Sequence, residues 1–227
     1  MAHEQVYRTD LIALNNSLVE GEVTVTLDST ARTVTVDIHA TGLEPNQVHI
    51  QHIHGFADDS DAKVPGIAFD SDRDGFVELA EGLPSYGPIQ LNLTLNPENA
   101  AHDHGTPGHD HTADAVFPTV GADEVLDYRE TFRFAADDPN AQAIFDGVTP
   151  LDRKEIVLHG MSVAEGSGAG TPGEVDGTAG YKLALPVASG ELRLAEDGGG
   201  QPGGMPDWNA IAVQATANFE ASGSWFI

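Results

Sequence analysis

Two short runs hold the residues best suited to chemistry. Segment 51–55 reads Gln-His-Ile-His-Gly, and segment 156–160 reads Ile-Val-Leu-His-Gly. Side chains at i and i+2 of a strand point to one face, so His52 and His54 would lie side by side. His159 ends a second apolar run that could lie beside them. Because imidazole binds copper, zinc, iron and nickel, the spacing predicts a transition-metal site. The alternative is a set of surface histidines on a polar sheet face.

A second motif, at 70–81, has the spacing of a twelve-residue calcium loop, with a glycine at the sharp turn. The oxygen ligands would be the Phe76 backbone carbonyl and the carboxylates of Asp70, Asp72, Asp74, Glu78 and Glu81. Of these, Glu78 could bind through a water molecule. The flanks 64–66 and 82–84 contain glycine and proline and do not resemble paired helices. We therefore expect a structural calcium loop rather than a sensor, the alternative being an acidic surface loop.

A third cluster of potential ligands is rich in histidine. Four histidines fall within ten residues: His102, His104, His109 and His111. They could bind copper or zinc, or add a fourth ligand to the first site. Such tracts are compositional signals, and a solvated loop is an equal alternative. Of the other histidines, His49 has the opposite strand parity to His52 and is expected to face away from it.

Composition limits the classes of function. The chain has 227 residues and a net charge of -26, spread along its length. Such an acidic surface repels phosphate backbones and anionic membranes, so nucleic acid is not expected as a partner. The negative charge could reflect halophilic adaptation to high salt or acidic loops that bind cations. Because the charge is spread along the chain, we favour adaptation to salt as its general cause. There is no cysteine, which excludes disulfides and thiolate sites. No apolar stretch is long enough to predict membrane insertion.

The elements that would position these residues are strands. Residues 22–27 and 33–38 alternate with period two around a turn and predict a hairpin. Further strands are expected at 48–54, 89–95, 126–134, 154–159, 181–186 and 191–194. One helix is expected within 138–147, with an aspartate cap, a first-turn proline and a closing glycine. Short strands with Gly/Pro/Asp turns predict an all-β Greek-key barrel or sandwich.

Long segments interrupt this pattern within what we interpret as a single domain, 1–227. They are the calcium-like insertion 57–88, the His-rich loop 96–118 and a glycine-rich stretch at 165–180. Loops of this length are usually functional or disordered. The C-terminal extension 198–227 alternates small or apolar residues with polar ones from 207 onward, so we interpret it as an added strand.

Both histidine runs resemble the copper-binding strands of copper/zinc superoxide dismutases. Segment 51–58 is similar to the strand that supplies two copper ligands, segment 155–159 to the later ligand strand, and segment 173–190 to the closing segment. The resemblance implies a Greek-key barrel with copper bound by His52, His54 and His159, and an extracytoplasmic or secreted protein. Residues 1–4, however, do not look like a signal peptide. The run 51–55 also resembles the core of chordin-type (CHRD) domains.

The departures from that family bear on activity. No histidine lies between Gly55 and Ala101, where the family places its zinc ligands, and Ser189 stands where its cysteine would be expected. The segment 185–188 lacks the family's active-site arginine. Without this cation, electrostatic guidance of superoxide would be weak. We therefore expect metal storage, delivery or sequestration rather than fast catalysis. A copper-dependent redox enzyme and a calcium-stabilised structural domain are the alternatives. The sequence leaves the oligomeric state open.

Overall fold

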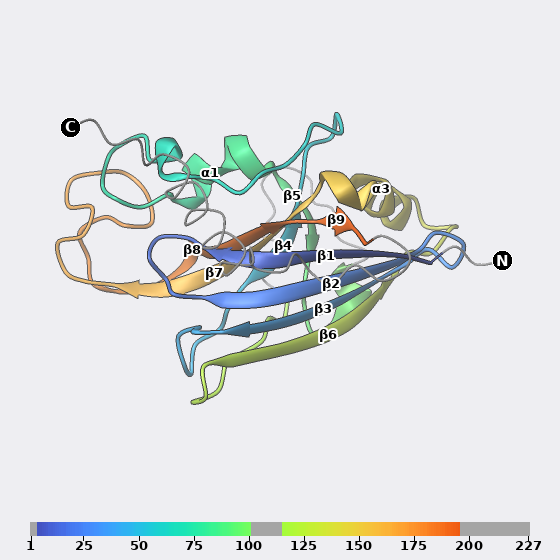
Figure 1. Cartoon of the computed structure of the whole chain (residues 1–227), viewed down its shortest axis with the longest axis horizontal. Helices are drawn as coiled ribbons and strands as arrows, with labels where there is room; N and C mark the ends of the chain where they lie inside the picture. The colour runs from blue at the N-terminus through green and yellow to red at the C-terminus, as the bar shows by residue number, and fades with distance from the viewer. Residues whose placement is uncertain (1–3, 101–114, 196–227) are drawn as a thin grey trace, which may run out of the picture. The chain divides into compact units, whose positions relative to one another are not determined.

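The structure is a computed structural model that describes residues 4–100 and 115–195. Its regular elements are mainly strands (Figure 1). They are β1 (Glu4–Ala13), β2 (Glu20–Asp28), β3 (Thr33–Thr41), β4 (Gln51–His54), β5 (Ile89–Asn92), β6 (Val125–Arg133), β7 (Glu155–Val163), β8 (Gly180–Glu191) and β9 (Arg193–Leu194). The predicted all-β class is confirmed.

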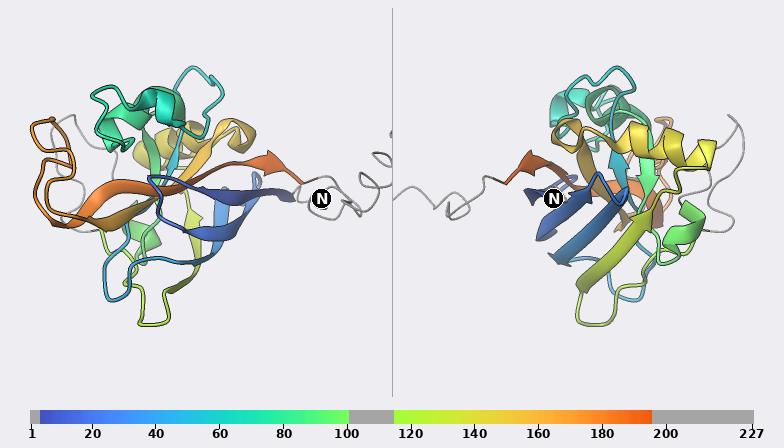
Figure 2. Two further views of the ribbon diagram at one scale, coloured as in Figure 1. Left: turned by 60° about the vertical axis from the view of Figure 1, so that its left-hand side comes forward. Right: turned by 90° about the vertical axis from the view of Figure 1, so that its right-hand side faces the viewer.

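The strands form one antiparallel sheet that folds over on itself (Figure 2). Its order is β5-β4-β7-β8-β1-β2-β3-β6, and β9 pairs with β1. Strand β1 joins the two halves, because its first part pairs with β2 whereas Ile12 and Ala13 pair with β8. The chain crosses to the other half between β3 and β4, crosses back between β5 and β6, and crosses again between β6 and β7. These crossings bring β4 beside β7, the two strands that carry the histidine runs.

The core lies between the two halves. The predicted hairpin forms as β2 and β3, in register at Val25 opposite Val36, and both side chains are fully buried. From the other half, Ile53 of β4 and Ile156 of β7 are paired with each other and join the same core. The odd-numbered side chain of β4 therefore faces the core, which leaves His52 and His54 on the outer face of the sheet.

Short helices occupy the connections. They are α1 (Leu79–Tyr86), α2 (Pro97–Ala100) and α3 (Pro139–Val148), with one-turn 3₁₀ helices at Ile67–Phe69 and Leu151–Arg153. The predicted helix within 138–147 is α3, and the Asp138 side chain accepts hydrogen bonds from the Asn140 and Ala141 amides. No helix in the described ranges is long and apolar enough to cross a membrane.

Two elements of the structure were not predicted from the sequence. The sequence after the calcium-like loop did not predict a helix, yet α1 begins inside that loop and contains Pro84. The helix begins at a capping box formed by Glu78 and Glu81, whereas Pro84 lies in its interior and removes one backbone N–H donor. Strand β1 was also not predicted. Tyr7 and Leu11 of β1 are buried on one face, but the polar Thr9 lies between them on that face, so its sequence does not alternate apolar and polar residues.

Candidate metal centre

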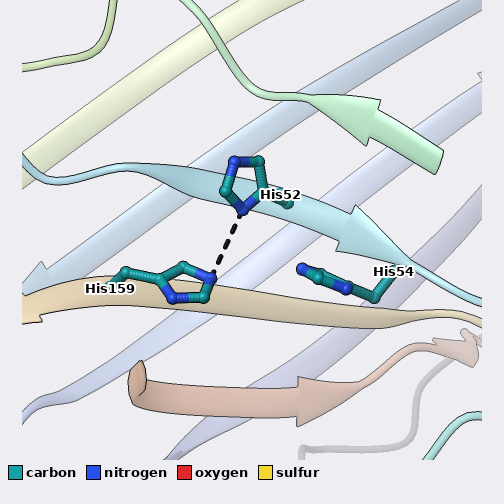
Figure 3. Close-up of side chains that lie close together, drawn as sticks. All are labelled: His52, His54 and His159. Carbon is teal, nitrogen blue, oxygen red and sulfur yellow. Dashed lines mark hydrogen bonds between the residues drawn. The ribbon is translucent and has the colours of Figure 1, made fainter. Parts of the chain in front are cut away.

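The three histidines meet on the outer face of the sheet. His52 and His54 come from β4, where they lie opposite Val157 and Glu155 of β7. His159 is two residues beyond Val157, so it shares the same face (Figure 3). The prediction that His52 and His54 lie on the same face of their strand is therefore confirmed.

The three imidazoles are close and buried. One nitrogen can be chosen from each ring, either Nδ1 or Nε2, so that the three chosen atoms all lie within 4.8 Å of one another. His52 Nδ1 is 3.3 Å from His159 Nε2, the contact drawn in Figure 3. His54 and His159 are fully buried, and His52 is 4% exposed. Two aromatic rings cover the cluster: Tyr86 lies 4.6 Å from the His54 ring, and Phe117 lies 5.7 Å from the His52 ring.

Backbone carbonyls fix the tautomers of two of these rings. His54 Nδ1 lies 2.8 Å from the Gly87 oxygen, and His159 Nδ1 lies 2.7 Å from the Ala184 oxygen. A carbonyl only accepts hydrogen bonds, so each Nδ1 carries the proton and each Nε2 presents a lone pair. His54 Nε2 is buried and has no hydrogen-bond partner in the described part of the chain. This is the outer-sphere arrangement that orients histidine ligands toward a metal.

Burial keeps the rings neutral. It lowers the pKa of His54 to about 3 and that of His159 to about 4, with the neighbouring His159 also lowering that of His54. The pKa of His52 is lowered well below its usual value, first by burial and then by His159 and His54. Metal binding requires neutral imidazole, so the site needs no deprotonation step at neutral pH. The residues therefore fit a copper, zinc, iron or nickel ion.

Comparison with known proteins adds nothing to this geometry: no protein-family model and no curated protein sequence matches the chain.

The acidic loop forms a second group of potential ligands. One carboxylate oxygen each of Asp70, Asp72 and Asp74 lies within 4.8 Å of the others, and all three residues are half-buried. Gly75 has a φ of +94°, which suits glycine at the predicted turn. Asp74 Oδ2 is buried and accepts no hydrogen bond from the described residues. The pKa of Asp74 is raised, first by burial and then by the nearby carboxylates.

The last two predicted calcium ligands have other partners and lie outside this group. Glu81 Oε1 accepts from the Ser71 amide at 2.6 Å and from the Ser71 hydroxyl at 2.7 Å, and Glu81 Oε2 accepts from the Glu78 amide. Glu78 is 3% exposed, and its Oε1 accepts from the Val175 amide at 2.6 Å. Burial, followed by the neighbouring carboxylates, raises the pKa of Glu78 to about 7. The Phe76 amide donates to Asp74 Oδ1.

Sequence reasoning missed two buried polar residues near the histidines. His49 has Nδ1 3.0 Å from the His159 oxygen and Nε2 2.9 Å from the Glu44 oxygen, so it joins β7 to the connection between β3 and β4. Glu155, opposite His54, is fully buried and accepts a hydrogen bond from the Ser189 hydroxyl, while its Oε2 has no described partner. Burial raises the pKa of Glu155 to about 8. Nothing in the local sequence of either residue signals this environment.

Two further predictions concern residues that the structure does not describe. The four histidines of the His-rich loop lie outside the described residues, as does the predicted C-terminal strand.

Proposed function

We propose that this chain is a copper-binding protein of the superoxide dismutase-like type, which stores, delivers or sequesters the metal. His52, His54 and His159 hold the ion. The observation that carries the proposal is the convergence of three buried, neutral imidazoles: one nitrogen of each ring lies within 4.8 Å of one nitrogen of each of the other two. Burying three polar rings together removes them from water, which is unfavourable in free energy. A bound ion would offset that cost.

The donor set supports copper over its competitors. All three donors are imidazole nitrogens, and the chain has no cysteine to add a thiolate. At a given nitrogen site, divalent copper generally binds more tightly than zinc, nickel or iron. Copper, when bound, supplies one-electron redox chemistry. The resemblance of both histidine strands to the dismutase ligand strands points to the same metal.

Burial and charge support storage or transfer over rapid turnover. His54 and His159 are fully buried, and the rings of Tyr86 and Phe117 cover the cluster. A small anion would have to approach a protein of net charge -26. No arginine, and no lysine, lies between Leu183 and Glu191, the segment beside His159. A copper-dependent redox enzyme would instead need an open approach and a cation to receive the anion.

We also propose that the acidic loop holds a structural calcium ion. The support is the calcium-type spacing together with the convergence of Asp70, Asp72 and Asp74. Calcium takes six to eight oxygen ligands, so the Phe76 carbonyl, water, and Glu81 after a change of partner would complete the shell. This role is compatible with the copper site, because the two groups of residues do not overlap.

The copper proposal is tested by metal analysis of protein purified without chelator, followed by copper and zinc titrations. Wild type is expected to hold one copper per chain. Replacing any of the three ligands by alanine should weaken binding by more than about a hundredfold, since even outer-sphere partners contribute ten- to hundredfold. His39→Ala is the matched control, because this histidine is exposed on β3. If the ligand variants bind as tightly as the control, the site is wrong.

A further inference from the structure

The two carbonyls that fix the histidine tautomers belong to different segments. Gly87 follows directly after α1, and Tyr86, the last residue of α1, packs against the His54 ring. Ala184 lies in β8, close to the loop 164–179 that joins β7 to β8. The geometry of the cluster therefore depends on the position of α1 relative to that loop.

The same two segments are joined to each other by a reciprocal pair of hydrogen bonds. Glu78, which caps α1, accepts from the Val175 amide of the loop at 2.6 Å. Glu174 of the loop accepts from the Leu79 amide, the first of α1, at 3.1 Å. We call Glu78 and Glu174 the carboxylate clamp.

Each clamped segment is connected to one of the two carbonyls. The helix α1 has eight residues, so it spans about 12 Å from Leu79 to Tyr86. On the loop side, Val175 is fully buried and packs in a small cluster with Leu185, the neighbour of Ala184. A shift of either clamped segment would reach a carbonyl that holds an imidazole.

The clamp is built at a cost. Glu78 is almost fully buried beside three other carboxylates, those of Glu174, Asp74 and Asp72. Gly173 permits the contact, since a Cβ on that residue would overlap the Glu78 carboxylate, and its φ is +140°. An exposed serine or aspartate would cap a helix without burying charge. The buried arrangement instead joins two segments that are distant in sequence.

From these contacts, and on the basis of the metal-binding role proposed above, we propose that Glu78 and Glu174 are positioning residues for the histidine site. They hold α1 against the loop 164–179, so that the Gly87 and Ala184 carbonyls keep Nε2 of His54 and His159 directed toward one point. Residues that would be read as part of an acidic surface therefore preorganise a nitrogen site.

The test uses metal-free, full-length protein with ¹⁵N-labelled histidine, in which NMR detects the Nδ1 protons of His54 and His159. Wild type is expected to show both protons in slow exchange with water. Glu78→Ala and the milder Glu174→Gln should speed their exchange by at least about tenfold and weaken copper binding within the ten- to hundredfold range of outer-sphere partners. The control is Glu165→Gln, an exposed residue of the same loop.

Circular dichroism identifies variants that are not folded, and Glu174→Gln remains informative if Glu78→Ala unfolds. Unchanged proton exchange in a folded clamp variant would overturn the positioning role, whatever the copper titration shows. If exchange changes as expected but wild type binds no copper, the proposed function fails while the clamp stands as a determinant of imidazole geometry.

Discussion

Lowering the pH from 7.5 to 5.5 should leave the copper affinity of the folded protein nearly unchanged. Protons compete with metal for each imidazole, and a solvated histidine of pKa about 6.5 loses about tenfold in affinity at pH 5.5. Three such ligands would lose about a thousandfold. Here the pKa values of His54 and His159 are about 3 and 4. At pH 5.5 these rings stay neutral, so proton competition at each is negligible.

The same shifts reduce the free energy of unfolding at low pH. Because the folded pKa values lie below the unfolded ones, this contribution is present above about pH 6.5 and is lost as the pH falls toward 4 and 3. At pH 5.5 the loss is about 1.4 kcal/mol per buried histidine. Glu155, with a pKa of about 8, acts in the opposite sense: its contribution is present at low pH and is lost as the pH rises through 8. We therefore expect the fold to persist at pH 5.5.

The assay is a competition titration against a chelator calibrated at each pH, with circular dichroism recorded on the same samples. A peptide of residues 50–56 provides the solvated comparison and should weaken steeply over this range. A loss of about a thousandfold in the folded protein would refute the assignment of buried, neutral ligands.

Three further predictions concern the rest of the molecule. Calcium at a hundredfold excess over its Kd should stabilise wild type by about 2.7 kcal/mol, and Asp72→Asn should reduce the shift in melting temperature; equal shifts would remove the calcium assignment. Copper-loaded protein should dismutate superoxide orders of magnitude below the diffusional ceiling of about 10⁸–10⁹ M⁻¹s⁻¹, and a near-diffusional rate in pulse radiolysis that disappears in His159→Ala would contradict this. Asp138→Ala should lower the free energy of unfolding by about 1 kcal/mol in urea titrations, because α3 loses its cap.

Local patterns predicted the parts of the fold that local interactions determine. The hairpin β2–β3 and the cap of α3 each depend on residues that are close in sequence. The shared face of His52 and His54 follows from strand parity alone. Strand β1 was missed because its place is set by pairing with β2 and β8, and its own residues carry little pattern.

The site required information that local sequence does not hold. Pairing of β4 with β7 brings His159 to His54, and the partner oxygens come from Gly87 and Ala184. A backbone carbonyl has no residue-specific signal in a sequence, so this outer sphere could not be predicted. The same is true of the clamp, since Glu78 has the spacing of a calcium ligand and finds a different partner only when the loop 164–179 folds over it.

The burial of the cluster relates its stability to its function. Burying three imidazoles on the outer face of a sheet lowers their pKa values, which costs stability below about pH 6.5. It also leaves His54 Nε2 with no hydrogen-bond partner among the described residues, which is unfavourable in the absence of an ion. The covering rings that exclude water would also slow the exchange of a bound ion. Tight retention and slow exchange suit storage or a controlled transfer, whereas rapid turnover needs an open ligand position and quick access. The cover of Tyr86 and Phe117, more than the identity of the three histidines, is therefore the feature that separates the proposed role from that of a fast enzyme.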